Sequence, residues 1–315
     1  MRTFTETYTA LKANIGKAII GKDGVIDLVL ITLFCGGHIL IDDVPGTGKT
    51  RLAKTLADSI DCACKRVQFT PDLLPADLTG INYFDMQESK FKFIPGPVFS
   101  NVFLADEINR ATPKTQAGLL ECMEERQTTV DGKTYRLEYP FMVIATQNPV
   151  ESMGTFPLPE AQLDRFLIKT RMGYPSRDES NEIIKSNAGE INGVGAVVSK
   201  EDIRAASAEI DKMYVHDDII NYISALIEAT RSHREALLGA SPRSGIHLLR
   251  VAKGYALING RNYVLPDDVK AVAVNVLAHR LVLNNSARVK NRQDEAIINE
   301  ILSSVRVPTE TAFGS

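Results

Sequence analysis

The sequence of 315 residues has no tryptophan, only four cysteines and no long uninterrupted hydrophobic run. Its longest apolar stretch, residues 29–41, is broken by Gly36, Gly37 and His38 and is too short to cross a bilayer. The first residues also lack the basic and then apolar pattern of a secretory signal peptide. We therefore expect a cytoplasmic protein without a membrane segment.

The sequence also lacks an excess of basic residues. Lys and Arg number 36 against 39 Asp and Glu, which gives a formal charge of −3. A dedicated nucleic-acid-binding protein usually carries a strong basic excess, so the composition makes nucleic acid an unlikely partner unless a local basic patch exists. With 44% hydrophobic and 24% charged residues, the chain is typical of a globular protein of about two domains.

Metal-binding and disulfide patterns are equally scarce. The four cysteines include one C-x-C pair but no C-x-x-C pair, and no histidine stands at ligand spacing from a cysteine or another histidine. We expect no zinc site and predict reduced thiols. The cysteines are Cys35, Cys62, Cys64 and Cys122.

In the first half of the chain, short apolar runs alternate with helical patterns. Such runs, each closed by a polar or glycine-rich loop, indicate buried parallel strands, and their alternation with helices predicts an open α/β sheet. The predicted strands are 38–41, 66–69, 101–105, 141–145 and 165–168, and the predicted helices between them include 50–60 and 114–125. Ligands of such sheets bind beyond the carboxyl ends of the strands.

From Ser176 onward the patterns are helical, and we find no convincing strand. Amphipathic helices are predicted at 219–231, 243–258 and 267–283, and the Gly- and Ala-rich residues 188–198 are predicted to form a surface loop. The chain therefore reads as an α/β domain at residues 1–175 and an all-helical domain at residues 176–315.

A glycine-rich loop follows the first predicted strand. Residues 43–50, DVPGTGKT, match the Walker A pattern G-x-x-x-x-G-K-[ST] at its end, whereas Asp43 replaces its first glycine. Glycines let backbone N–H groups wrap phosphates, and the N-terminus of the following helix favours anions. The alternative is a turn without a ligand. The predicted nucleotide-binding residues of this loop are Pro45, Gly46, Thr47, Gly48, Lys49 and Thr50.

Lys49 is expected to neutralise the β- and γ-phosphates of the nucleotide, and the Thr50 hydroxyl to hold Mg²⁺. Two acids, Asp106 and Glu107, end the third predicted strand. Asp106 is positioned to coordinate Mg²⁺ directly or through water, and Glu107 to activate the attacking water. Asn148 follows the next strand and is expected to hold that water. The alternatives are solvated acids and a turn-forming Asn-Pro.

Several longer strings resemble the AAA+ ATPases and, more narrowly, the MoxR family. The resemblance covers nearly the whole chain, from about residue 21 to residue 283. The strings are 69–80 (FTPDLLPADLTG), 96–99 (GPVF), 105–111 (ADEINRA), 120–127 (LECMEERQ), 145–149 (ATQNP), 158–166 (LPEAQLDRF) and 239–243 (GASPR).

This resemblance implies a P-loop nucleotide-binding domain, a parallel sheet between helices, followed by an all-helical lid. It also implies an insert near residues 70–95 that projects a hairpin. Asn148 looks like sensor 1, Arg165 like the arginine finger that reaches the neighbouring subunit's nucleotide, and Arg243 like sensor 2 on a lid helix. The segment of Ile20 and Gly21 resembles the stretch that contacts adenine.

For the arginines, the residues alone favour simpler explanations. Arg165 stands next to Asp164, a ready partner for a salt bridge, and Arg243 is undecided without the family pattern. Arg110 and Arg126 are further candidates for contacts between subunits, or solvated charges. A guanidinium from a neighbour suits the charge on a transferred phosphoryl group and makes hydrolysis depend on assembly.

The resemblance implies ATP hydrolysis with Mg²⁺, in a ring of copies that is expected to be hexameric. ATP is expected to lie between the α/β domain and the lid, with Arg165 and Arg243 coupling nucleotide state to domain closure. The implied function is remodelling or maturation of partner proteins, including those with von Willebrand factor A domains. The alternatives are a magnesium-chelatase-like motor subunit, a nucleic-acid motor of the helicase type, and a regulator that binds ATP and barely hydrolyses it.

Overall fold

The computed structural model describes residues 2–42, 46–148, 154–187, 194–290 and 292–308. At its centre is a five-stranded parallel sheet of order β2-β5-β8-β1-β9. Its strands are β1 (Ile39–Asp42), β2 (Cys64–Gln68), β5 (Val102–Asp106), β8 (Met142–Gln147) and β9 (Ile168–Thr170). The parallel α/β sheet is thus confirmed, although β9 starts three residues later than predicted.

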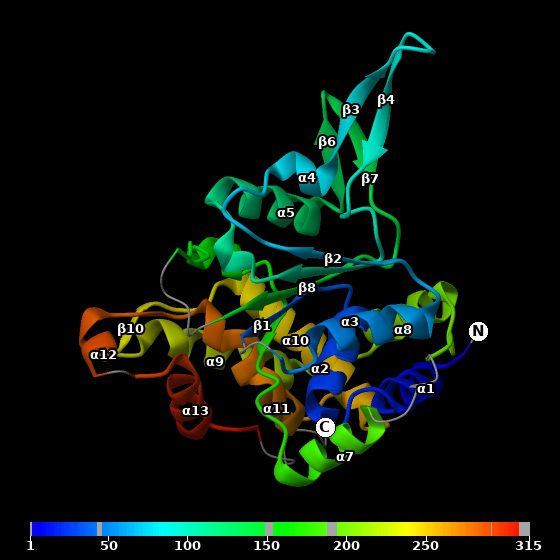
Figure 1. Ribbon diagram of the computed structural model, residues 1–315. Helices are drawn as coiled ribbons and strands as arrows, with labels where there is room; N and C mark the ends of the chain where they lie inside the picture. The colour runs from blue at the N-terminus through cyan, green and yellow to red at the C-terminus, as the bar shows by residue number, and fades with distance from the viewer. Residues whose placement is uncertain (1, 43–45, 149–153, 188–193, 291, 309–315) are drawn as a thin grey trace.

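Alternate residues of each central strand enter two different cores, because successive side chains in a strand point to opposite faces. Ile39 and Ile41 belong to one core and Leu40 to the other. The first core also takes side chains from α1 (Phe4–Gly16), α2 (Asp23–Phe34) and α3 (Lys49–Ile60). The second takes them from α4 (Pro75–Thr79) and α5 (Pro113–Glu125), which lie on the other side of the sheet in Figure 1. Burial on both faces explains why the strand sequences are continuous apolar runs.

Two hairpins extend from the α4–α5 side. The larger, β3 (Gly80–Asp85) with β4 (Lys90–Pro95), projects far beyond the body of the molecule in Figure 1. It is the hairpin expected in the insert near residues 70–95. Its base leans on a second hairpin, β6 (Gln127–Val130) with β7 (Lys133–Arg136), through Phe93 and Tyr135, whose ring centroids are 4.0 Å apart. The second hairpin was not predicted.

The second half is mainly helical. Its helices are α7 (Arg177–Asn187), α8 (Lys200–Lys212), α9 (Asp217–Ser232), α10 (Pro242–Ile258), α11 (Pro266–Leu277), α12 (Asn285–Val289) and α13 (Asp294–Ser304). The prediction that no strand follows Ser176 was wrong, because β10 (Ala236–Leu238) and β11 (Val282–Leu283) pair antiparallel.

The predicted helix 267–283 was too long. Helix α11 ends at Leu277, a 3₁₀ turn covers residues 278–280, and Leu281 is extended. The apolar residues after the turn are buried in β11 instead of continuing the helix. Of the predicted loop 188–198, residues 188–193 lie outside the described residues. Residues 194–198 form neither helix nor strand, yet Val198 is buried.

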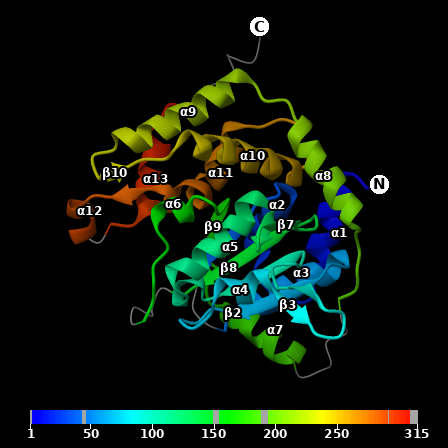
Figure 2. The same ribbon diagram turned by 90° about the horizontal axis from the view of Figure 1, so that it is seen from above.

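Helices α8 to α13 share the first core with α1–α3 instead of building one of their own. Figure 2 shows α8, α9 and α10 together beside the α/β layers. Helix α10 packs closely on α2 at Gly254, where an added Cβ would lie 2.9 Å from Ile31 Cγ2. The position of the helical part is therefore fixed by apolar packing as well as by chain connection.

No helix within the described ranges is both long enough and apolar enough to cross a membrane. The four cysteines are free thiols, as predicted. Burial raises the pKa of Cys35 to about 12 and that of Cys122 to about 11, so both remain protonated and unreactive at neutral pH.

Candidate functional site

The carboxyl ends of β1, β8 and β5 lie side by side at one edge of the sheet, because the three strands are neighbours and parallel. The glycine-rich loop follows β1, Asn148 follows β8, and Asp106 and Glu107 end β5. The residues predicted from separate parts of the sequence are thus brought to one edge, where ligands of parallel sheets bind.

The described part of the glycine-rich loop has the shape of an anion cradle. Gly46 and Gly48 have φ angles of 86° and 93°, and an added Cβ would meet nothing within 4 Å at either. Gly48 is the N-cap of α3 and makes no side-chain capping bond to the N–H groups of the first turn, which point along the helix axis toward the loop. These residues fit a bound phosphate. Pro45 and Asp43 lie outside the described residues.

Lys49 and Thr50 open α3, so both stand at the end of the cradle. Thr50 is exposed and Lys49 half-buried. A lysine and a hydroxyl at the first turn are the groups that a magnesium-bound triphosphate requires in this class of loop.

Both carboxylate oxygens of Asp106 are occupied. Thr146 donates a hydrogen bond of 2.6 Å to Oδ1, and Arg66 of β2 donates to Oδ2 through Nη2 at 2.7 Å and through Nε at 3.1 Å. A cation therefore already contacts the carboxylate that we assign to Mg²⁺, which shows that this place accommodates positive charge. With both oxygens engaged, contact with the metal through water requires less rearrangement than direct contact.

Glu107 has a left-handed backbone, with a φ angle of 56° and a ψ angle of 52°. Its N–H donates to the Thr146 hydroxyl at 2.8 Å, and its carboxylate pairs with Arg110 at 2.9 Å. The left-handed turn takes Glu107 out of the line of β5, and its side chain pairs with Arg110 whereas that of Asp106 contacts Thr146 and Arg66. The two adjacent acids thus have different surroundings, as two different roles require.

Asn148 is 6% exposed and directly follows β8, between the glycine-rich loop and the two acids. Ile20 and Gly21 lie between α1 and α2. Gly21 lines a cleft of about 440 Å³ together with Thr170 at the end of β9 and Tyr255 of α10. This cleft is on the same sheet edge as the phosphate cradle, because β9 is parallel to β1 and adjacent to it.

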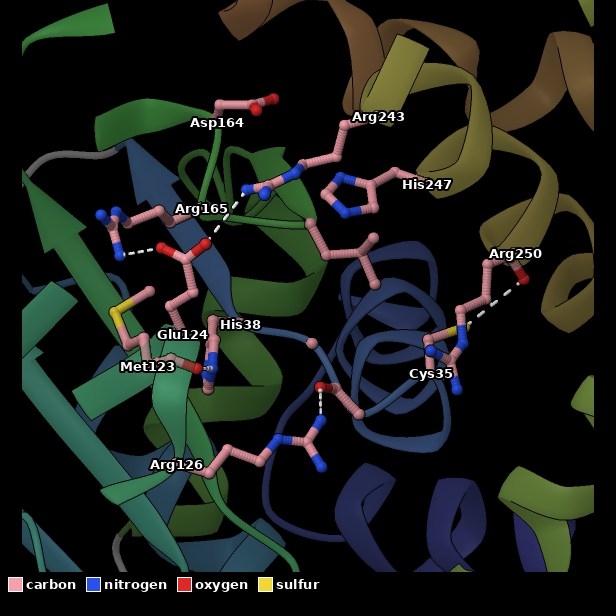
Figure 3. A pocket seen from close by; sticks show the side chains of 13 residues that line it. Cys35, His38, Met123, Glu124, Arg126, Asp164, Arg165, Arg243, His247 and Arg250 are labelled. Atoms are coloured by element: carbon pink, nitrogen blue, oxygen red, sulfur yellow. Dashed lines mark hydrogen bonds and ion pairs between the residues drawn. The ribbon is translucent and has the colours of Figure 1, made fainter. Parts of the chain in front are cut away.

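Arg165 and Arg243 meet in a different place. Both pair with the carboxylate of Glu124 near the end of α5, and Arg243 Nη1 lies 3.4 Å from it. Figure 3 shows the two guanidinium groups on either side of that carboxylate. They line a pocket of about 300 Å³ that also includes Gly36 and His38. These last two residues precede β1, so the pocket lies at the amino end of that strand, opposite the phosphate cradle.

The sequence-based partner of Arg165 was wrong. Asp164 pairs with Arg280 at 2.6 Å, whereas Arg165 binds Glu124 and the carbonyl oxygen of Leu120. Of the other two candidates, Arg110 contacts Glu107 and Arg126 donates to the Gly36 carbonyl oxygen at 2.8 Å.

The pocket of Arg165 and Arg243 carries a positive excess, because Arg126 and Arg250 line it too and only Asp164 and Glu124 oppose them. His247 adds no charge at neutral pH, since burial and the nearby Arg280 lower its pKa to about 4. Such a pocket suits an anion presented from outside.

Sequence reasoning missed Thr146, Arg66 and Glu124. Thr146 stands inside the string ATQNP and Arg66 begins a predicted strand, but neither had a local signal of its contact with Asp106. The one available signal was the parallel sheet itself, which predicts that residues at corresponding positions of neighbouring strands meet. Among the described residues, no three His, Cys, Asp or Glu side chains gather to hold a metal by themselves.

The fold and the site define a class of protein. Residues 38–168 match the ATPase family associated with various cellular activities, and residues 228–301 match the AAA lid domain. A crystal structure from Cytophaga hutchinsonii, described as that of a candidate ATPase, is 41% identical, superposes with a TM-score of 0.91 and covers 97% of this chain and 96% of its own.

Relatives narrow the class. "Chaperone MoxR1" of Mycobacterium tuberculosis is 38% identical over 324 aligned positions, covering 98% of this chain and 84% of the relative. "Protein MoxR" of Paracoccus denitrificans is 31% identical, covering 94% and 95% respectively. The chain belongs to the MoxR family of AAA+ ATPases.

Proposed function

We propose that this protein binds ATP with Mg²⁺ and hydrolyses it at the edge where β1, β8 and β5 end. The observation that carries the proposal is the convergence of the phosphate cradle, the acids Asp106 and Glu107, and Asn148 at that edge. Membership of an ATPase family supports it.

Different residues bind the phosphates, the metal ion and the adenine. Gly46, Gly48 and the first turn of α3 bind the phosphates, with Lys49 neutralising their charge. Bound Mg²⁺, held by Thr50 and Asp106, supplies charge neutralisation of the phosphates. Gly21, which lines the adjoining cleft, and its neighbour Ile20 contact the adenine.

Glu107 accepts a proton from the water that attacks the γ-phosphorus, and the bond to the bridging oxygen of ADP breaks as the new P–O bond forms. Asn148, beside the acids, holds that water. For Glu107 to take the proton, its ion pair with Arg110 has to loosen, which is easy because the Arg110 side chain is 43% exposed.

The position of Arg165 and Arg243 supports an assembly in which both act on a neighbour's nucleotide. The two share Glu124 at the amino end of β1, away from the cradle of their own subunit. In a ring, expected to be hexameric, this face meets the phosphate edge of the next copy. The γ-phosphate then replaces Glu124 as the anion that the two guanidinium groups bind.

The relative named "Chaperone MoxR1" supports remodelling of partner proteins as the purpose of hydrolysis. Partners with von Willebrand factor A domains are the client class that we propose. The projecting β3–β4 hairpin, on which Phe84 and Phe91 are 49% and 72% exposed, is available to contact them.

The test measures phosphate release and calorimetric nucleotide binding by the wild-type protein and by Lys49→Ala. The proposal expects magnesium-dependent phosphate release by the wild-type protein, and at least tenfold weaker binding for the variant because it loses a charge-assisted contact. A wild-type protein that neither binds nor hydrolyses ATP at a concentration where it is oligomeric contradicts the proposal.

A further inference from the structure

A single hydroxyl connects the two acids of the site. Thr146 lies on β8, next to β5, and its side chain is completely buried. Its Oγ1 donates to Asp106 Oδ1 at 2.6 Å and accepts the backbone N–H of Glu107 at 2.8 Å. Because a hydroxyl has one hydrogen to donate and lone pairs to accept, both bonds form at once.

The two bonds act on different features. The bond to Asp106 is charge-assisted and fixes the rotation of the carboxylate, whose other oxygen is held by Arg66. The bond from Glu107 satisfies a partly buried N–H at a residue whose left-handed backbone is unfavourable for most residues other than glycine. Without it, this N–H has no other described partner, and the peptide before Glu107 keeps only the bond that its carbonyl oxygen accepts from the Phe69 N–H at 2.8 Å.

We propose that Thr146 is a positioning residue for hydrolysis: its hydroxyl orients Asp106 and holds the backbone of Glu107 in the conformation that directs its carboxylate. This rests on the proposed ATP hydrolysis. Thr146 does not touch the nucleotide in this account. It acts through the two acids, and its contribution therefore falls on the chemical step and little on ATP binding.

The test compares Thr146→Val, which keeps the shape and removes the hydroxyl, with Thr146→Ser, which keeps the hydroxyl. Thr128→Val is the matched control, because Thr128 is a buried strand threonine on β6, away from the acids. We expect kcat of Thr146→Val to fall about tenfold or more, while KM and the dissociation constant for Mg–ATP change less than about threefold. Thr146→Ser and Thr128→Val should stay within about threefold of the wild-type kcat.

A measurement without nucleotide checks the geometry itself. Hydrogen–deuterium exchange of the peptide that contains Glu107 should become faster in Thr146→Val, since its N–H loses its acceptor, and should stay slow in Thr146→Ser. Poor folding of the valine variant would make exchange faster throughout the chain, whereas loss of the Thr146 acceptor should make it faster mainly in the peptide that contains Glu107.

The inference is overturned if Thr146→Val keeps the wild-type kcat, if serine is as damaging as valine, or if exchange at Glu107 is unchanged. A loss of ATP affinity as large as the loss of kcat also contradicts it, because a positioning role for the acids does not predict it. Failure of the proposed function is distinguishable, since the wild-type protein would then show no turnover for any variant to lose.

Discussion

Arg280 and Asp164 form an ion pair that joins the helical lid to the α/β domain, with Arg280 Nε 2.6 Å from Asp164 Oδ1. The Arg280 side chain is 2% exposed and that of Asp164 is 26% exposed. Arg280 also donates to the carbonyl oxygen of Phe166 at 2.8 Å and contacts His247 Nδ1 at 2.8 Å. The charge is therefore buried but fully engaged, the condition under which removing one partner is costly.

Replacing Arg280 with Met should lower the free energy of unfolding by about 3 kcal/mol, because Asp164 and the Phe166 carbonyl lose their partner. Chemical denaturation of the wild-type protein and the variant measures this. Lys270→Met on α11 is the control, since its pair with Asp267 is an exposed one worth less than about 1 kcal/mol. Equal destabilisation by the two substitutions contradicts the assigned role of Arg280.

Acid should destabilise the protein below pH 6.5 because buried histidines are held neutral. Burial lowers the pKa of His38 to about 4, and the ring uses both nitrogens, contacting Met123 O at 3.1 Å and accepting the Val143 N–H at 2.9 Å. Burial also lowers the pKa of His247 to about 4 and that of His279 well below its usual value.

The sign follows from proton uptake. Between the unfolded pKa of about 6.5 and the folded pKa, the unfolded chain binds more protons, so stability falls as pH falls. Each such histidine contributes a slope of about 1.4 kcal/mol per pH unit in that window. Denaturation series between pH 7 and 5 should show this loss of stability. In His38→Gln, the free energy of unfolding should change with pH less steeply, by the amount that corresponds to about one proton. An unchanged slope in His38→Gln contradicts a neutral buried His38.

Mixing experiments show whether Arg165 and Arg243 act on the nucleotide of their own subunit or on that of a neighbour. Arg165→Ala and Arg243→Ala should each bind ATP normally and lose most hydrolysis. When either is mixed with Lys49→Ala, part of the activity should return, because an intact phosphate cradle then meets intact arginines from a neighbour. Phosphate release at a series of mixing ratios measures the recovery.

The mixture of Arg243→Ala with Lys49→Ala distinguishes the two possibilities for Arg243 directly. If it acted on the nucleotide of its own subunit, no mixture with Lys49→Ala would contain a complete site. A mixed ring, verified by differential tagging, that shows no recovery would therefore place Arg243 at its own nucleotide and contradict the pocket geometry. Recovery for Arg165 alone would separate the two arginines.

Local sequence patterns predicted the sheet well, because parallel strands buried on both faces are short apolar runs. The parallel topology alone predicts that Lys49, Asp106 and Asn148 lie at one edge of the sheet. The division at residues 175 and 176 stays a prediction. What failed depends on distant contacts: Glu124 and Arg243 are separated by 119 residues, and Asp164 and Arg280 by 116. No local pattern specifies such pairs, so the residues alone favour the adjacent Asp164 as the partner of Arg165.

Short strands failed for a related reason. β11 has two residues, and its apolar side chains continue the periodicity of α11 closely enough to look helical. Only the antiparallel partner β10, more than forty positions earlier in the chain, makes the extended form favourable. Tertiary contacts, and not the local sequence, therefore decide whether the residues of β11 form a strand or continue the helix.

The most direct test of the account is a single-turnover measurement on Glu107→Gln with Mg–ATP. Glutamine keeps the size and the left-handed backbone but accepts no proton at neutral pH. We expect ATP affinity within about threefold of wild type and phosphate release slowed at least about a hundredfold. Phosphate release at the wild-type rate, with ATP bound, would show that Glu107 is not the group that activates water.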